Sequence, residues 1–170
     1  MKKFPLLLLD AGPIIKLFEL NLWDKFLQAC DVTVSRTVVP ELKWASQEME
    51  DIRIDMAIYE DKIRIIDRDV TVVRSFYSTL SPLYKDLIEP DDGEVATLEF
   101  LLSSSEEWFL CSADGPVFRL MGFLGRGDQG ISLEEVLDKI GLKQSTLEWP
   151  YTKKFRLERT QQGKIEAAQK

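Results

Sequence analysis

The stretch that decides the fold is Leu6-Leu-Leu-Leu9-Asp10-Ala-Gly-Pro13, a short apolar run that ends in an acid and a turn. A continuous apolar run of this length is typical of a parallel strand that is buried on both faces. Pro13 fits the first position of a helix, where the missing N–H has no partner to lose. The stretch therefore predicts a buried strand, a tight turn and a helix.

The rest of the chain continues this alternation. Short apolar runs predict further strands over 32–35, 63–66 and 108–112. Helical periodicity and capping residues predict helices over 13–29, 37–49, 69–77, 116–124 and 133–140, and another that Asp91 or Asp92 opens and 103–105 ends. No strand is visible beyond Gly122. Strands that alternate with helices indicate an α/β fold with a mostly parallel central sheet flanked by helices.

The composition narrows the chemistry. The chain has 170 residues, which fit one domain, and no histidine, which excludes Ser-His-Asp and Cys-His hydrolysis and His-ligated zinc. Cys30 and Cys111 lie in apolar settings, so we expect reduced core thiols in a cytoplasmic protein. The apolar run before Asp10 is too short for a signal peptide and no stretch is long enough to span a bilayer, so we expect no membrane partner. Catalysis would have to rest on carboxylates.

The charge is unevenly distributed. The net charge is −7, yet the segment from Pro150 to Lys170 carries six basic residues against two acidic ones. An acidic body is a poor general surface for nucleic acid, but it is compatible with clustered acids that bound cations neutralise. We expect the basic tail to be a solvated chain end. The alternative is a helix that binds a partner or covers the substrate.

Four acids stand at the ends of predicted elements. They are Asp10, Glu41, Glu94 and Asp114. Each alone fits a turn, a cap or a helix-dipole partner. If the sheet is parallel, all four positions gather at one edge, where carboxylates cannot crowd together unpaired. Hard divalent cations with oxygen ligands, Mg²⁺ or Mn²⁺, resolve that conflict.

The sequence resembles the PIN-domain nucleases. The resemblance rests on four acidic motifs in the family's order, namely Leu9-Asp10-Ala-Gly-Pro-Ile-Ile, Ser35-Arg-Thr-Val-Val-Pro-Glu41-Leu, Asp91-Asp-Gly-Glu94-Val-Ala and Cys-Ser112-Ala-Asp114. It covers the chain from about Phe4 to Leu142. It implies a three-layer PIN-like fold for residues 1–142, followed by a C-terminal basic extension over 143–170.

The resemblance also implies roles for single residues. Asp10, Glu41, Glu94 and Asp114 would be the acids that bind Mg or Mn and catalyse phosphodiester hydrolysis, most often in RNA. Ser112 matches the small hydroxyl residue two positions before the last acid, and Arg36 and Arg119 would contact substrate phosphates. Many such ribonucleases are toxins paired with a protein antitoxin, and many form homodimers, so an inhibitor protein and a second copy are implied partners.

Two departures and two alternatives accompany this interpretation. Gly115-Pro116 stands where many relatives have a second Asp after the fourth acid, and the final strand is missing. The alternative function is a catalytically silent PIN-like module that binds a protein partner or nucleic acid. A haloacid-type phosphatase also ends its first strand in an Asp, but it would need a second Asp where Gly12 stands.

Overall fold

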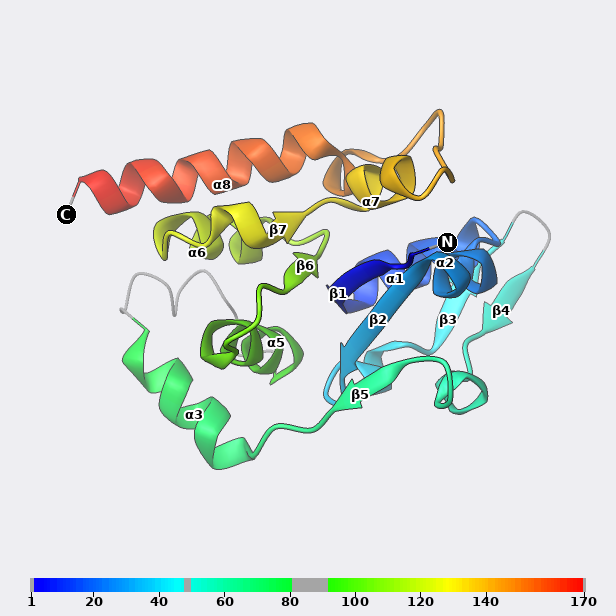
Figure 1. Cartoon of the computed structure of the whole chain (residues 1–170), viewed down its shortest axis with the longest axis horizontal. Coiled ribbons are helices and arrows are strands. Elements are labelled where there is room, and N and C mark those ends of the chain that lie inside the picture. Colours follow the sequence, from blue (N-terminus) through cyan, green and yellow to red (C-terminus); the bar gives the residue numbers. More distant parts are fainter. Residues whose placement is uncertain (1, 48–49, 81–91, 170) are drawn as a thin grey trace.

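A parallel five-stranded sheet forms the centre of the molecule (Figure 1). The computed structural model describes residues 2–47, 50–80 and 92–169. The strand order is β5-β2-β1-β6-β7, and every neighbouring pair is parallel. The strands are β1 (Phe4–Leu9), β2 (Cys30–Ser35), β5 (Arg64–Ile66), β6 (Phe109–Cys111) and β7 (Gly130–Ile131). The predicted α/β fold with a mostly parallel sheet is confirmed.

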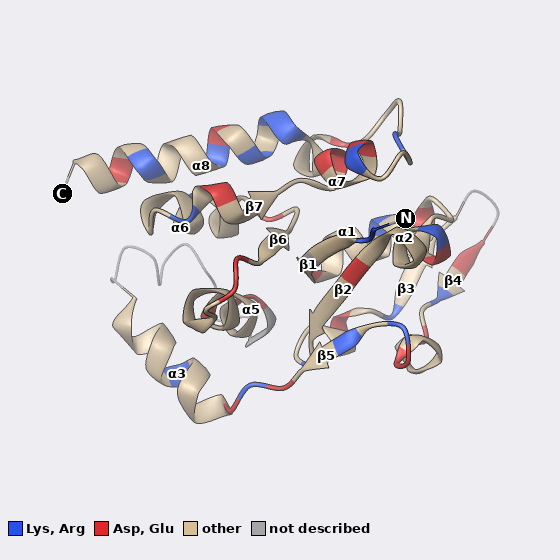
Figure 2. Ribbon diagram, in the orientation of Figure 1, with Lys and Arg blue, Asp and Glu red and all other residues tan. Residues whose placement is uncertain are grey.

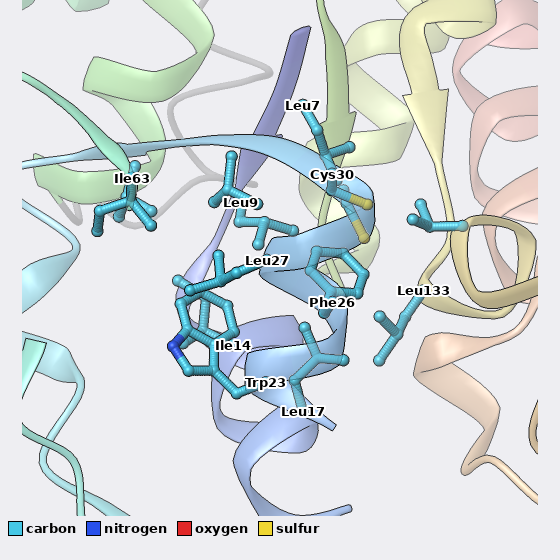
Figure 3. Close-up of a cluster of buried hydrophobic side chains, with 14 of the residues drawn as sticks. Leu7, Leu9, Ile14, Leu17, Trp23, Phe26, Leu27, Cys30, Ile63 and Leu133 are labelled. Carbon is cyan, nitrogen blue, oxygen red and sulfur yellow. The ribbon is translucent and has the colours of Figure 1, made fainter. Parts of the chain in front are cut away.

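Helices cover both faces of this sheet because β1 is apolar on both sides. Leu7 and Leu9 pack into one hydrophobic cluster and Leu8 into the other, as the two-residue period of a strand requires. Figure 3 shows Leu7 and Leu9 among the side chains of the first cluster. That cluster takes in α1 (Ala11–Glu19), α2 (Trp23–Ala29) and α7 (Leu133–Lys139). The second cluster takes in α3 (Val70–Thr79), α5 (Asp92–Ser103), α6 (Gly115–Phe123) and α8 (Lys153–Ala168). The fold therefore has three layers.

Several elements agree with the sequence expectations. The strands predicted over 32–35, 63–66 and 108–112 correspond to β2, β5 and β6. The side chain of Asp69 accepts hydrogen bonds from Thr71 and Val72 and caps α3. Ser132 and Glu135 form a capping box at the start of α7. Helix α5 begins as expected, but Asp91 and the side chain of Asp92 lie outside the described residues.

The helix predicted over 13–29 is wrong in its extent. It starts two residues earlier, because Asp10 caps Ala11, and it is interrupted between α1 and α2. At the interruption Asn21 has a φ of 54°, a left-handed conformation that Asn tolerates better than most residues. The apolar periodicity continues through this bend, since both helices face the same cluster.

The helix predicted over 37–49 is also wrong. A 3-10 helix, η1 (Val39–Glu41), is followed by an antiparallel pair, β3 (Trp44–Ser46) and β4 (Asp51–Arg53). Thr37 does not cap a helix: the N-cap of η1 is Val38, and the Thr37 hydroxyl bonds to the hydroxyl of Ser35 at 2.7 Å. A second 3-10 helix, η2 (Met56–Tyr59), precedes β5.

The end of the chain differs most from the sequence expectations. A 3-10 helix, η3 (Gly127–Gln129), leads into β7, a strand of two residues that is too short to show a hydrophobic pattern. After η4 (Trp149–Tyr151), helix α8 lies along α6 (Figure 1), with Phe155 buried in the second cluster. The expectation of a solvated chain end is therefore wrong. No helix within the described ranges is both long enough and apolar enough to cross a bilayer.

Candidate active site at the carboxyl edge of the sheet

The topology creates a switch point between β1 and β6. The connection that leaves β1 leads to β2 on one side of it, whereas the connection that leaves β6 leads to β7 on the other side. Ligands of open parallel sheets bind in the crevice that such diverging connections leave at the carboxyl ends of the strands. Asp10 directly follows β1 and Ser112 directly follows β6, and Leu9 pairs with Cys111 in the ladder.

One serine makes hydrogen bonds to two of the predicted acids, to the carboxylate of one and to the backbone of the other. The Ser112 hydroxyl donates to Oδ2 of Asp10 at 2.9 Å and accepts from the backbone N–H of Asp114 at 3.0 Å. The N–H of Asp10 donates to the carbonyl of Cys111 at 3.1 Å, which continues the β1–β6 ladder. Ser112 is fully buried. The ladder and this hydroxyl together set the position of Asp10 relative to the chain that enters α6.

The two aspartates use their carboxylates differently. Oδ1 of Asp10 accepts the N–H of Ala11 at 2.8 Å and thereby caps α1. Asp114 occupies the corresponding N-cap position of α6, yet its side chain makes no capping bond to that helix. An acid at an N-cap normally accepts a hydrogen bond from the first turn. The carboxylate of Asp114 therefore contributes no cap to α6, although the residue occupies the cap position.

The other two predicted ligands come from different elements. Glu41 is the last residue of η1 and is exposed, and Glu94 lies in the first turn of α5 and is half-buried. Within 2–47, 50–80 and 92–169, no three Asp, Glu, Cys or His side chains form a group that could hold one metal ion. Ser112 links the carboxylate of Asp10 to the backbone of Asp114. The cluster of four ligands stays a prediction.

Helix α5 is attached to the same edge of the sheet by an ion pair between a partly exposed arginine and a buried glutamate. Arg68, which follows β5, donates from Nε and Nη2 to the carboxylate of Glu99 at 2.6 and 2.7 Å. These bonds raise the pKa of Arg68, because they stabilise its charged form more than burial opposes it. Glu99 is 5% exposed, so removal of Arg68 would leave a buried charge. The pair fixes the helix that carries Glu94.

Both arginines predicted to contact phosphate are held by carboxylates. Arg36 follows β2 and donates from Nε to Asp67 at 3.0 Å, with both side chains exposed. Arg119 donates from Nε to Glu166 of α8 at 2.8 Å and makes a second bond to it through Nη2. An exposed pair such as Arg36–Asp67 contributes little to stability and opens easily. The Arg119 pair is instead part of the contact between α6 and α8.

Lys16 forms two ion pairs that the sequence did not predict. Its ammonium lies 2.5 Å from Glu19 and 2.6 Å from Glu148, and the residue is 8% exposed. Burial lowers the pKa of Lys16, but the hydrogen bonds that its ammonium donates to both glutamates outweigh burial and leave the pKa raised. The Tyr151 hydroxyl donates a long bond of 3.5 Å to the carbonyl of Gly12. The segment after α7 therefore packs beside α1, and no local signal in the sequence connects residues so far apart.

The two thiols of the core are unreactive. Burial raises the pKa of Cys30 to about 12 and that of Cys111 well above its ordinary value, so both thiols stay protonated. Both are free. The chemistry available at the edge is therefore that of carboxylate oxygens and a buried hydroxyl, which suits a hard cation.

The chain was also compared with known proteins. No protein-family model, curated protein or solved structure matches it.

Proposed function

We propose that the chain is a PIN-like, Mg- or Mn-dependent endoribonuclease that hydrolyses phosphodiester bonds at the carboxyl edge of its sheet. One observation carries the proposal. Asp10 and Asp114 are joined through the buried hydroxyl of Ser112 at the switch point, and α6 does not use the Asp114 carboxylate as a cap. The order of the four acidic motifs along the chain adds to this support.

The donor set fits a hard divalent cation. Asp10 and Asp114 offer carboxylate oxygens, which Mg²⁺ and Mn²⁺ prefer, and the site needs neither histidine nor thiolate. In this proposal the two aspartates hold the ion, and Glu41 and Glu94 complete its surroundings directly or through water. When bound, such an ion polarises the phosphoryl group and makes a bound water more acidic.

The chain's own residues position the reacting groups. The Ser112 hydroxyl donates a hydrogen bond to Asp10 and so holds one carboxylate oxygen in a fixed direction. Arg36 lies beyond the end of β2, and its exposed pair with Asp67 can exchange for a substrate phosphate at low cost. Guanidinium groups bind phosphate with two parallel hydrogen bonds, so Arg36 is suited to orient the strand that is cleaved.

The proposal includes a cytoplasmic location, a substrate and protein partners. Two free, buried thiols are typical of the cytoplasm, where reducing conditions keep cysteines unpaired. RNA is the favoured substrate. A protein inhibitor of the antitoxin type and a second copy of the chain are the partners that the PIN resemblance implies.

Replacing Asp10 with asparagine tests the function directly. Asn keeps an oxygen for the N–H of Ala11, so Asp10→Asn should fold normally while RNA cleavage in Mg²⁺ or Mn²⁺ falls at least about a hundredfold. Cleavage of a labelled single-stranded RNA is the measurement. Asp138→Asn, an exposed acid on α7, is the matched control and should cleave like the wild type. Near-normal cleavage by Asp10→Asn would refute the assignment.

A catalytically silent binding module is the second candidate. It is favoured by the carboxylates that already hold Arg36 and Arg119. A ligand that binds only the folded state raises the melting temperature, so a Mn²⁺ titration separates the candidates. Stabilisation by Mn²⁺ that Asp10→Asn abolishes, together with cleavage that a chelator stops, supports the nuclease. Absence of both supports the module.

A further inference from the structure

A hollow between the start of α6 and the middle of α8 has no role in the site described above. Its volume is about 330 Å³, and its lining residues are Gly115, Pro116, Arg119, Phe155, Arg159 and Gln162. None of the six is acidic, in a chain whose net charge is −7. Gly115 directly follows Asp114, so the hollow begins one residue from an acid of the candidate site.

Arg159 of α8 supplies the uncompensated charge. No carboxylate in the described part of the chain lies within 4.0 Å of its guanidinium, which makes only a long bond of 3.5 Å to Gln162. The guanidinium carbon lies 5.3 Å from the centre of the Phe155 ring, which is a cation–π contact. The basic residues of α8 appear blue in Figure 2.

The first residue of α6 leaves room for this arginine. A Cβ at Gly115 would lie 3.2 Å from Nε and 3.3 Å from Cδ of Arg159, and 3.4 Å from the ring of Phe155. Any larger side chain there would displace the guanidinium.

Arg119 also lines the hollow. Glu166 takes two of its hydrogen bonds, and a guanidinium has five N–H donors, so others remain for a ligand. Since Glu166 offsets the charge of Arg119, the net positive charge of the hollow comes from Arg159. Two guanidinium groups around one hollow are the arrangement that recognises a phosphate group.

We propose that this hollow binds a backbone phosphate of the RNA strand, next to the phosphate that is cleaved. Arg159 is the principal contact and Arg119 the second. The inference rests on the proposed nuclease function and extends it, because it makes the C-terminal helix part of the substrate-binding surface. The phosphodiester is the recognised group, so RNA and DNA of one sequence would both enter the hollow.

Binding measured without cleavage tests the proposal. Fluorescence anisotropy with labelled single-stranded RNA and DNA 12-mers is recorded in EDTA for the wild type, Arg159→Gln, Arg159→Lys and Lys153→Gln. We expect Arg159→Gln to weaken RNA binding about tenfold and to reduce the salt dependence by about one phosphate contact. Arg159→Lys keeps the charge but loses the fork, so it should recover only part of the affinity. Lys153→Gln makes the same charge change at an exposed position of α8 and should change affinity less than twofold.

Cleavage assays keep the two proposals apart. In Mg²⁺, Arg159→Gln should raise KM about tenfold with kcat within about threefold of the wild type. If the wild type binds RNA, Arg159→Gln weakens binding and no metal supports cleavage, the phosphate site stands and the nuclease function falls. If the wild type cleaves RNA but Arg159→Gln behaves like Lys153→Gln, the phosphate site is refuted and the nuclease function stands. Failure of the wild type to bind either 12-mer refutes the phosphate site.

Discussion

Two regions that meet at Asp114 are built in different ways. The edge between β1 and β6 is set by the backbone ladder and one buried hydroxyl, that of Ser112. The contact between α6 and α8 is set by close approach at two glycines, Gly122 and Gly163, and by the Arg119–Glu166 pair. The first region joins two strands through backbone hydrogen bonds. The second joins two helices through an ion pair and through glycines, whose missing side chains let the backbones approach. Local patterns can therefore reveal the strands that form the first region, whereas the second region depends on how two helices dock.

The largest expected loss of stability comes from a substitution in the contact between α6 and α8. A Cβ at Gly163 would lie 1.8 Å from the carbonyl oxygen of Arg119 and 2.8 Å from the N of Phe123, and backbone atoms cannot move aside cheaply. Alanine gains about 1 kcal/mol of helix propensity, but the collision outweighs it. We expect Gly163→Ala to lower the free energy of unfolding by about 3 kcal/mol, measured by urea denaturation.

Gly141→Ala is the control for this substitution. Gly141 has a φ of 77° and nothing within 4 Å of a Cβ, so the cost there is backbone strain alone, about 1 kcal/mol. Equal losses in the two variants would mean that α6 and α8 do not approach as closely as the structure has them.

A smaller effect is expected in the first region. Ser112→Ala removes the donor to Asp10 and the acceptor for the N–H of Asp114, so we expect a loss of about 1.5 kcal/mol. Ser35→Ala is the matched control at the end of β2, where the hydroxyl bonds to the Thr37 hydroxyl, and it should cost about 0.5 kcal/mol. Thermal unfolding of both variants gives the comparison. A Ser112→Ala variant as stable as Ser35→Ala would show that the serine does not hold the edge together.

The smallest effect concerns pH and the attachment of α8 to α7. Burial raises the pKa of Glu135, but hydrogen bonds from Arg156 and Ser132 outweigh it and leave the pKa below its ordinary value of 4.5. A lowered native pKa gives stabilisation that is complete above the unfolded value and is lost as pH falls through the native one. Between about pH 5 and pH 3, the wild type should lose about 1 kcal/mol more stability than Glu135→Gln.

Denaturation midpoints across that pH range are the measurement. Glu158→Gln, an exposed acid of α8, is the control and should follow the wild-type profile. Parallel profiles for the wild type and Glu135→Gln would show that this ion pair contributes nothing to the attachment of α8.

The misassigned segments show where local patterns fail. The apolar positions of 37–49 fit a helix as well as they fit η1, β3 and β4, because both arrangements bury Leu42 and Ala45. The two residues of β7 are too few to show any period, and only pairing with β6 makes them a strand. Residues 13–29 keep one apolar face through a bend that only the backbone at Asn21 reveals.

The candidate site also has some features that the sequence predicts and others that only the tertiary structure shows. The position of Asp10 at the end of β1 followed from an acid directly after an apolar run, and that of Asp114 from an acid shortly after the apolar run that forms β6. The role of Ser112 as their link required the register between β1 and β6. The pairs Arg119–Glu166 and Lys16–Glu148 join residues 47 and 132 positions apart, so no local pattern could indicate them.

By itself, the sequence determined the α/β class, the mostly parallel sheet, the strands β1, β2, β5 and β6, and the acids that follow β1 and β6, because these depend on hydrophobic period and on neighbouring residues. Only the tertiary structure decided that Ser112 connects the two aspartates and that α8 docks on α6 with Arg159 beside Gly115. Such contacts depend on shape and charge between segments that are distant in sequence, and the free energy of docking is a property of both surfaces together.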